Sequence, residues 1–545
     1  MSATARPPEG GASSRGEVVA QRPEGSPACA TARPPEGGAS SRGEVVAQRP
    51  EGSPACLGQS EFAWALADPG SAPAQADARL RWADGRIVAL ESAPGAVPGP
   101  RRLVLPALAN AHDHARTFRS ATLGAWGHPL ESWLPYLGVL PALDPYASAA
   151  TSFARSLRHG VVDLMVHYTR VQGGLPYIEE AEAVGRAARD VGVRIGFAVA
   201  MRDRQGIAYA PDDAVLARLP AGMRGPVRTR LAAPALDVAS QLARVDEVAA
   251  ACEAPHMRVQ YGPTGVQWCS QALLEGIARA CAEHGRPVHM HLLETRYQRE
   301  WADVAYPQGV VRHLDALGLL TPRLTLAHCT WCRPDELALL AERGVTIAVN
   351  TSSNLALRSG VAPVQAMLAA GCRVAMGLDG LAFDEDDDAL REMRLAYALH
   401  QGTGFDAAMS PAQAWAFAAR HGRRAVRGVD DGGGVLAPGA PADFLVLDWD
   451  ALDDDALWPD IEPWHLLLAR GHAGYVREVV AAGRAVMRDG RVVGVDETSL
   501  RAELLAQARS LLASDGQAGA WRSTLDALAG ELAGLYRGGM HCGCC

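Results

Sequence analysis

The sequence predicts an α/β protein, a (β/α)8 TIM-like barrel with a small composite β-sandwich domain formed by segments before and after the barrel. Three observations lead to this fold class. Eight apolar segments of strand length recur in the central part of the chain, helical stretches separate most of them, and shorter alternating strands occur on both sides. Regular alternation of strands and helices is typical of a parallel barrel.

Residues 1–56 begin the chain with a repeat. Residues 3–29 recur without change as residues 30–56, and each copy is rich in Pro, Gly, Ser and Glu. Such a segment cannot bury enough apolar surface to offset the entropy lost on ordering, and a solenoid would need repeats with a periodic apolar face. We therefore expect a disordered leader without a catalytic role.

Residues 57–103 and 429–500 form the two parts of the predicted sandwich. Both contain short runs of alternating apolar and polar residues separated by turn sequences such as Asp84-Gly85. That pattern is typical of antiparallel strands with one buried face. Strands are expected at residues 78–82, 85–90, 443–447, 476–480 and 485–487.

The predicted barrel comprises residues 104–428. The apolar run of its first expected strand begins one residue before this range, at residue 103. The strands are expected at residues 103–105, 161–165, 193–199, 258–261, 288–292, 324–327, 345–349 and 373–376. The clearest helical stretches between them are residues 180–190, 273–284, 334–342 and 363–370. In such barrels the chemistry lies beyond the carboxyl ends of the strands, so these ends are where functional residues are expected.

Residues 501–545 are expected to form a C-terminal helical segment and a Cys-rich tail, which reads His541-Cys-Gly-Cys-Cys545. The tail could bind a soft metal ion, but it lacks the paired spacing of a structural zinc site. A frayed terminus is the interpretation that we favour.

The composition excludes several classes of function. The net charge is −9, from 61 acidic and 52 basic residues, whereas a nucleic-acid-binding protein usually has a basic face. No apolar run is long enough to span a bilayer, and the first residues lack the apolar core of a signal peptide. We expect a cytoplasmic protein with no nucleic-acid partner and no membrane association; a homodimer stays open.

Histidine and aspartate residues follow four of the predicted barrel strands. His112 and His114 follow the first strand, and His289 and His291 end the fifth. Because side chains alternate along a strand, the members of each pair share a face. With His328 after the sixth strand and Asp379 after the eighth, the expected rim can bind a divalent ion.

Sequence motifs in a fixed order cover nearly all of the chain beyond the leader, from about Leu103 to Val495. They are LPALANAHDH (105–114), ESWL (131–134), GPTGVQWCS (262–270), HMHLLET (289–295), LTLAHC (324–329), NTSSNLALRSGVAP (350–363), GLDG (377–380) and PGAPADFLVLD (438–448). The chain thereby resembles the metal-dependent amidohydrolase superfamily, in particular its branch of cytosine/guanine/adenosine-type deaminases and s-triazine hydrolases.

The resemblance implies a role for each rim residue. His112, His114, His291 and Asp379 would be the metal ligands, with Asp379 also the base that takes the water proton. Glu294 would be the proton shuttle, and His328 would donate to or orient the attacking oxygen. His289 matches a variable position and is expected to be structural. Two-metal relatives use a carbamylated lysine, and this chain has no lysine, so a single ion follows, Zn2+ or else Fe2+.

The expected reaction is the hydrolytic deamination of a small nitrogen heterocycle, such as a purine, pyrimidine, pterin or triazine. A bound Zn2+ or Fe2+ lowers the pKa of its water toward ~7 and so creates the attacking hydroxide. Arg202, Gln267 and Trp268 are the expected substrate contacts, through an acidic substituent, a hydrogen-bonding edge and a ring face. Two alternatives stay open. One is dechlorination, dealkylamination or cyclic-amide hydrolysis on the same scaffold, and the other is a non-catalytic metal-binding protein.

Overall fold

Eight parallel strands form the barrel. The computed structural model describes residues 58–95, 99–232, 234–380 and 385–543, so the predicted leader lies outside the described residues. In sheet order the strands are β5 (Leu108–Asn110), β6 (Val161–Tyr168), β7 (Arg194–Met201), β8 (Met257–Pro263), β9 (Val288–Leu292), β10 (Leu324–His328), β11 (Thr346–Val349) and β12 (Arg373–Met376). Just past β5, the backbone N–H of Ala111 donates to the carbonyl of Met376 at 2.7 Å, which brings the first and last strands together. The predicted barrel is confirmed.

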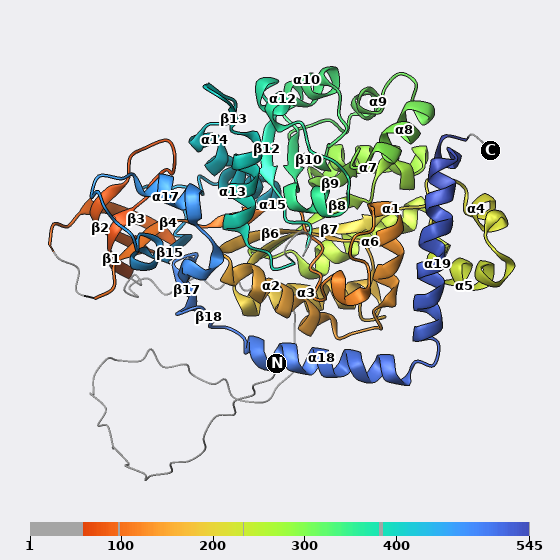
Figure 1. Ribbon diagram of the computed structural model, residues 1–545, viewed down its shortest axis with the longest axis horizontal. Helices are drawn as coiled ribbons and strands as arrows, with labels where there is room; N and C mark the ends of the chain where they lie inside the picture. The colour runs from red at the N-terminus through yellow and green to blue at the C-terminus, as the bar shows by residue number, and fades with distance from the viewer. Residues whose placement is uncertain (1–57, 96–98, 233, 381–384, 544–545) are drawn as a thin grey trace, which may run out of the picture. The chain divides into compact units, whose positions relative to one another are not determined.

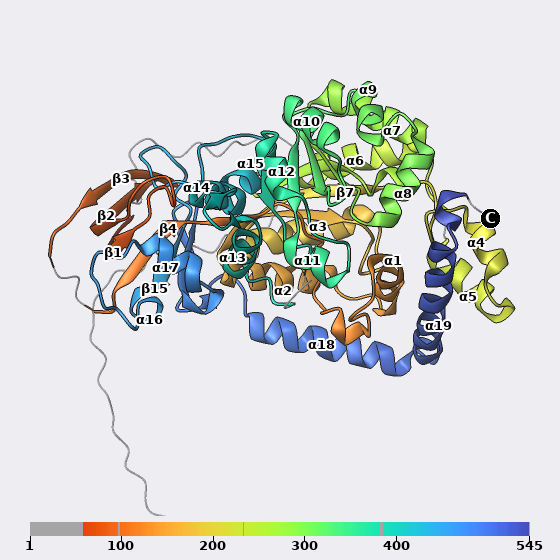
Figure 2. The ribbon, with the colours of Figure 1, turned by 45° about the horizontal axis from the view of Figure 1, so that its top comes forward.

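Helices follow the barrel strands and cover the outside of the barrel (Figures 1 and 2). The helices up to the end of the barrel are α1 (Leu130–Trp133), α2 (Pro145–Arg158), α3 (Tyr177–Val191), α4 (Asp212–Arg218), α5 (Ala221–Leu231), α6 (Val238–Cys252), α7 (Gln271–His284), α8 (Arg296–Ala305), α9 (Val310–Ala316), α10 (Pro334–Glu342), α11 (Thr351–Ala356), α12 (Val364–Ala369), α13 (Ala389–His400), α14 (Pro411–Trp415) and α15 (His421–Arg427). Their apolar faces pack on strands whose residues are almost all buried, which is the pattern of a sheet covered by helices.

The expected first barrel strand, residues 103–105, is placed in the other sheet. These residues lie in β4 (Arg102–Pro106), which pairs with β1 (Gly58–Ala65) and with β15 (Phe444–Asp448). The apolar run is long enough for two strands, and the backbone passes from one sheet to the other at Pro106-Ala107, so β5 is the strand that opens the barrel. Periodicity alone cannot divide an uninterrupted apolar run between two sheets.

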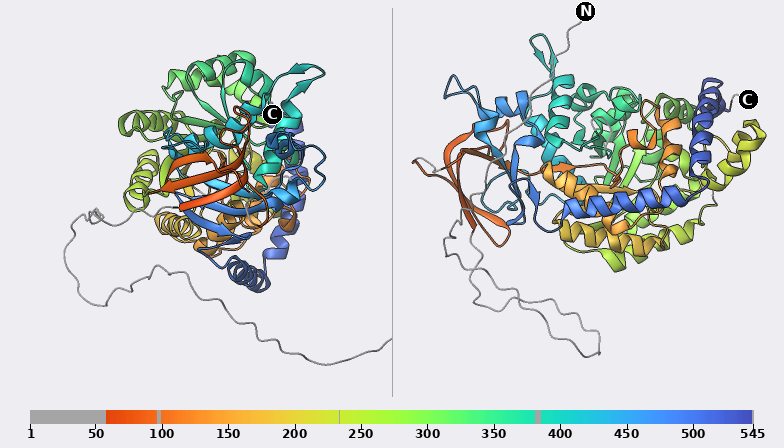
Figure 3. Two further views of the ribbon diagram at one scale, coloured as in Figure 1. Left: turned by 90° about the vertical axis from the view of Figure 1, so that its left-hand side faces the viewer. Right: turned by 60° about the horizontal axis from the view of Figure 1, so that its bottom comes forward.

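Segments from both ends of the chain form the second sheet, as predicted. Its strand order is β18-β17-β16-β15-β4-β1-β2-β3, one hydrogen-bonded sheet of eight strands (Figure 3, left). The strands not yet given are β2 (Gln75–Ala83), β3 (Arg86–Ser92), β16 (Val476–Ala481), β17 (Arg484–Arg488) and β18 (Arg491–Val492). Its own core contains side chains from both parts of the chain, including Phe62, Ile87 and Phe444.

A buried ion network joins this sheet to the barrel. Asp443, next to β15, accepts hydrogen bonds from Arg194 of β7 and from Arg423 of α15 at 2.7–2.9 Å. The same two guanidinium groups bind Asp163 of β6 at 2.8–2.9 Å. Burial raises the pKa of Asp163, but the charges of Arg194 and Arg423 outweigh burial and lower that pKa to about 2. These four charges therefore hold the end of the barrel against the sheet.

Two long C-terminal helices complete the chain, α18 (Glu497–Ser514) and α19 (Ala518–Arg537). They follow the short helices α16 (Trp449–Leu452) and α17 (Pro463–Arg470). Helix α18 lies along the barrel and packs on α2, and α19 packs on α1 and α5 (Figure 3, right). None of the helices in the described part of the chain is long and apolar enough to cross a membrane.

Candidate active site

The residues predicted at the rim of the barrel meet at the carboxyl ends of their strands. His112 and His114 directly follow β5, His291 lies in β9, His328 ends β10, and Asp379 follows β12. His328 and Asp379 have positive φ angles, 73° and 54°. Such conformations are costly for residues other than glycine and tend to occur where a side chain must be aimed at a functional site.

Donor atoms of these side chains lie close together. One donor atom each from His112, His114 and His291 lies within 4.8 Å of the others, and the same holds for His112, His328 and Asp379. The Oδ1 atom of Asp379 is 3.0 Å from Nε2 of His114 and 3.4 Å from Nε2 of His112. All five side chains are more than nine-tenths buried. The cluster offers nitrogen and oxygen donors to one small volume.

The hydrogen bonds of the imidazoles fix which nitrogen of each ring can bind a cation. Nδ1 of His114 is 2.8 Å from the carbonyl of His167, and Nδ1 of His291 is 2.6 Å from the carbonyl of Thr264. A carbonyl oxygen only accepts, so each Nδ1 carries the proton and each Nε2 keeps its lone pair. Burial lowers the pKa of His114 to about 3, so this ring is neutral, as a ligand must be.

His112 and Asp379 complete the donor set. Nδ1 of His112 lies 2.7 Å from Nε2 of His289, so the extra histidine holds the ring of His112. Nε2 of His112 is buried and has no hydrogen-bond partner among the described residues. Burial opposes the charge of Asp379, but the neighbouring imidazoles of His112 and His114 hold the pKa of that carboxyl well below its usual range. An ionised carboxylate and neutral imidazoles are the protonation states that bind a divalent cation.

Glu294 lies three residues beyond His291, at the edge of the donor cluster. Burial and then the charge of Asp379 raise its pKa well above the usual value, which favours the protonated carboxyl group. The hydroxyl of Ser359 donates to its Oε1 at 3.2 Å, and its backbone N–H donates to the side-chain oxygen of Gln298 at 2.9 Å. A buried, neutral and positioned carboxyl group can deliver a proton.

His328 stands beside Glu294. Its Nε2 is 3.7 Å from Oε2 of Glu294, and its Nδ1 is 2.9 Å from the side-chain oxygen of Asn354. Burial lowers the pKa of His328 to about 4. On the other side of the cluster, the hydroxyl of Ser353 donates to Oδ2 of Asp379 at 2.6 Å. Ser353, Asn354 and Ser359 all come from the motif NTSSNLALRSGVAP, which the sequence singled out without a role for these three positions.

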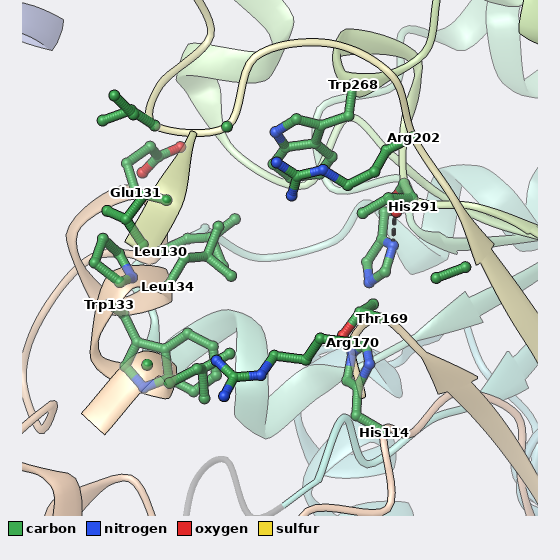
Figure 4. A pocket seen from close by; sticks show the side chains of 18 of the residues that line it. His114, Leu130, Glu131, Trp133, Leu134, Thr169, Arg170, Arg202, Trp268 and His291 are labelled. Atoms are coloured by element: carbon green, nitrogen blue, oxygen red, sulfur yellow. Dashed lines mark hydrogen bonds between the residues drawn. The ribbon is translucent and has the colours of Figure 1, made fainter. Parts of the chain in front are cut away.

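The donor cluster forms the floor of a cavity of about 860 Å3. His114, His291, Glu294, His328 and Asp379 line its floor. The walls include aromatic and apolar side chains together with several arginines (Figure 4). Among the residues that line the walls are Arg116, Leu130, Glu131, Trp133, Leu134, Arg170, Arg202, Tyr209, Trp268 and Tyr536. A cavity of this size, apolar but with a few polar groups, is typical of a small-molecule site.

Of the three substrate contacts expected from the sequence, the structure brings two to the cavity. Arg202, after β7, and Trp268, after β8, both line it (Figure 4). Gln267 is buried and is not among the lining residues that the structure describes, and its role as a substrate contact stays a prediction. Gln267 and Trp268 are neighbours in a single 3-10 turn, where consecutive side chains point about 120° apart, so the two side chains point in different directions.

Three arginines give the cavity a positive wall. Arg116 donates to the backbone carbonyl of Asp379 at 3.2 Å, and its guanidinium carbon lies 4.9 Å from the centre of the Trp133 ring. Arg170, after β6, and Arg202 also line the cavity, and in the described structure neither guanidinium makes a hydrogen bond or ion pair. Arg170 belongs to none of the motifs in the sequence. Only its position just after a barrel strand could have indicated that it lines the cavity.

Comparisons with known proteins agree with this geometry. The model of the amidohydrolase family matches residues 103–494. The 5-methylthioadenosine/S-adenosylhomocysteine deaminase of Nitratidesulfovibrio vulgaris is 32% identical over 452 residues, which cover 78% of this chain and 91% of that enzyme. A 5'-deoxyadenosine deaminase of Methanothermobacter thermautotrophicus is 34% identical over 249 residues, but this match covers 44% of the chain and only 55% of that enzyme.

Solved structures show the same fold. An adenosine deaminase from Xanthomonas campestris with bound zinc is 24% identical, with a TM-score of 0.64, and the match covers 86% of this chain and 98% of that one. A mutant of atrazine chlorohydrolase from Arthrobacter aurescens, complexed with zinc and atraton, is 21% identical, with a TM-score of 0.66 and 82% and 98% coverage. At these identities the likeness extends to the architecture of the barrel and its accompanying sheet.

Proposed function

The chain belongs to the amidohydrolase family, and we propose that it is a metal-dependent hydrolase that removes the amino group of a small nitrogen heterocycle. One observation carries the proposal: metal donors and the buried carboxyl group of Glu294, whose pKa is raised, line the floor of one small-molecule cavity. The relatives named as deaminases of 5'-deoxyadenosine and of 5-methylthioadenosine or S-adenosylhomocysteine support it.

The donor set fits one divalent ion. The proposed ligands are His112, His114, His291 and Asp379, and the proposed ion is Zn2+, which takes nitrogen and oxygen ligands in a four-coordinate site. The unpartnered Nε2 of His112 and the Nε2 atoms of His114 and His291 supply the nitrogen donors. The sequence has no lysine to bridge a second ion. When bound, such an ion supplies an acidified water as the nucleophile.

The residues around the donors divide the proton transfers between them. Asp379 is ionised and takes the proton of the attacking water. Glu294, whose raised pKa favours the protonated form, delivers a proton to a ring nitrogen, which makes the neighbouring C=N carbon electrophilic. His328, held at Nδ1 by Asn354, turns Nε2 toward Glu294 and orients the oxygen that adds to the ring. The proton held by Asp379 then passes to the amino group, the proton of the added hydroxyl returns to Glu294, and ammonia leaves as the carbonyl forms.

The walls of the cavity favour a heterocycle that carries an acidic substituent. Arg170, which is exposed, and Arg202, which is half-buried, line the cavity without an ion pair inside the described structure, so an acidic group on the ligand would supply their counter-charge. Trp268 offers a ring face for stacking, and Arg202 offers two parallel N–H groups to a carboxylate. We therefore propose Arg202 and Trp268 as substrate contacts, with Arg170 beside them.

An assay of ammonia release tests the function. Zinc-loaded enzyme is given adenosine derivatives, guanine, cytosine, pterins and amino-triazines, each with and without an acidic substituent. Release of ammonia from at least one heterocycle, with one tightly bound ion per barrel, is the expected result. Release of chloride or an alkylamine instead, from a triazine, would show the alternative hydrolysis on the same scaffold. A metal-loaded enzyme that hydrolyses none of these classes would contradict the proposal.

A further inference from the structure

A second group of potential metal ligands lies at the C-terminus, outside the barrel cavity. Helix α19 ends at Arg537, and a short 3-10 turn, Met540–Cys542, follows it. Donor atoms of His541 and Cys542 from this turn and of Glu300 from α8 all lie within 4.8 Å of one another. An imidazole, a thiol and a carboxylate are the three side-chain types that zinc takes in proteins.

His541 is built into this position. The side chain is 5% exposed, and its ring lies 5.2 Å from the ring of Tyr297 and 5.3 Å from that of Tyr536, measured between centroids. Its Nε2 is 2.8 Å from Oε2 of Glu300. Its Nδ1 is buried and has no hydrogen-bond partner in the part of the chain that the structure describes. Because Nε2 is the nitrogen that faces Glu300, it is the one that can share an ion with that carboxylate, and Nδ1 then carries the proton of the neutral ring.

We propose that Glu300, His541 and Cys542 bind a divalent ion of the zinc type, separate from the ion in the barrel. The sequence continues with Cys544 and Cys545, which lie outside the described residues. The frayed terminus favoured from the sequence therefore does not describe residues 540–543, which form a turn with Met540 and His541 buried. Sequence spacing could not reveal the site because Glu300 lies 241 positions before His541.

An ion at this position ties two elements of the cavity wall together. Tyr536, the penultimate residue of α19, lines the cavity, and its hydroxyl accepts a hydrogen bond from the backbone N–H of Tyr209 at 3.2 Å. Helix α8, which carries Glu300, also carries Gln298, whose side-chain oxygen binds the backbone N–H of Glu294. The ion would hold α19 against α8 and so keep Tyr536 in the wall.

Cobalt substitution distinguishes the two sites, because only the C-terminal one contains sulfur. A thiolate bound to Co2+ gives a charge-transfer absorption, which a site of imidazoles and carboxylate cannot give. The full chain is stripped of metal, kept reduced and titrated with Co2+. We expect two equivalents to bind and the thiolate band to appear with one of them. Cys542→Ser should lose the band and one equivalent while it keeps the other. His541→Ala should weaken the binding of the same Co2+ equivalent, and so should Glu300→Gln, which is a change at the surface.

Two controls make the outcome decisive. Cys252, half-buried in α6, is a cysteine distant from the cluster, and Cys252→Ser should leave the band and the stoichiometry unchanged. His291→Ala removes a proposed barrel ligand and should leave the band intact, so that a failed barrel mechanism cannot be mistaken for a failed C-terminal site. A wild-type protein without a thiolate band overturns the proposal, as does a band that persists at full strength in Cys542→Ser.

Discussion

Replacement of Glu294 by glutamine separates proton delivery from metal binding. The side chain keeps its size, and its amide oxygen can still accept the hydrogen bond from Ser359, which is 3.2 Å from Oε1 in the native protein. The backbone N–H of Glu294 keeps its bond to Gln298. Only the proton is lost. Burial and the charge of Asp379 raise the pKa of the native carboxyl group well above its usual value, which favours the protonated form that the substitution removes.

The expected rate loss follows from this geometry. General acid–base catalysis contributes about 10²–10⁴-fold, so kcat should fall by ~10²-fold or more, which corresponds to about 2.7 kcal/mol in the activation barrier. Steady-state ammonia release measures the rate, and metal analysis by mass spectrometry should show an unchanged metal content. Glu275→Gln, an exposed glutamate of α7, is the matched control and should behave as wild type. Near-normal turnover of Glu294→Gln would refute the assignment of the proton shuttle.

Four further predictions follow. His291→Ala removes a proposed ligand and should lose both the metal and the activity. His328→Ala should keep the metal but have a lower turnover rate. Metal content and turnover, measured on the same samples, test both. Asp443→Asn leaves Arg194 and Arg423 short of a buried partner and should lower the free energy of unfolding by about 3 kcal/mol, measured by urea denaturation. The native pKa of Asp163, about 2, lies below its unfolded value of about 3.9. The contribution of the ionised Asp163 to the free energy of unfolding is therefore complete above about pH 4 to 5 and is lost as the pH falls toward 2. Asp163→Asn should flatten the dependence of stability on pH in that range. Deletion of residues 1–56 should leave melting temperature and turnover unchanged, and a large loss of either would show that the repeat has a structural role.

The sequence predicted the parts of the molecule that follow a local period. Strands of the barrel are buried on both sides and read as short apolar runs, so seven of the eight expected strands overlap barrel strands of the structure. The remaining expected strand, at residues 103–105, is the first in chain order. It was assigned to the wrong sheet because its apolar run continues into the true first strand of the barrel. The polar residues at the strand ends met as expected because parallel strands bring their carboxyl ends to one rim.

The walls of the cavity could not be predicted in the same way. Glu131, Tyr209 and Tyr536 come from a loop helix, from the segment after β7 and from the last long helix, and no common spacing relates them. Trp268 and Gln267 were both predicted from their place after a strand, but a 3-10 turn points adjacent side chains in different directions, and only Trp268 is among the described lining residues. Residues that meet through tertiary packing leave no periodic pattern in the chain.

These wall residues are connected to the proposed proton shuttle. The hydroxyls of Thr295 and Tyr209 both donate to Oε1 of Glu131, and the amide of Gln298 donates to the hydroxyl of Tyr209 at 3.2 Å. Gln298 in turn accepts from the backbone N–H of Glu294. The position of Glu294 thus depends on the wall that encloses the substrate as well as on its own strand. A change at Gln298 should therefore affect kcat and KM together, whereas a change at Glu294 should act mainly on kcat.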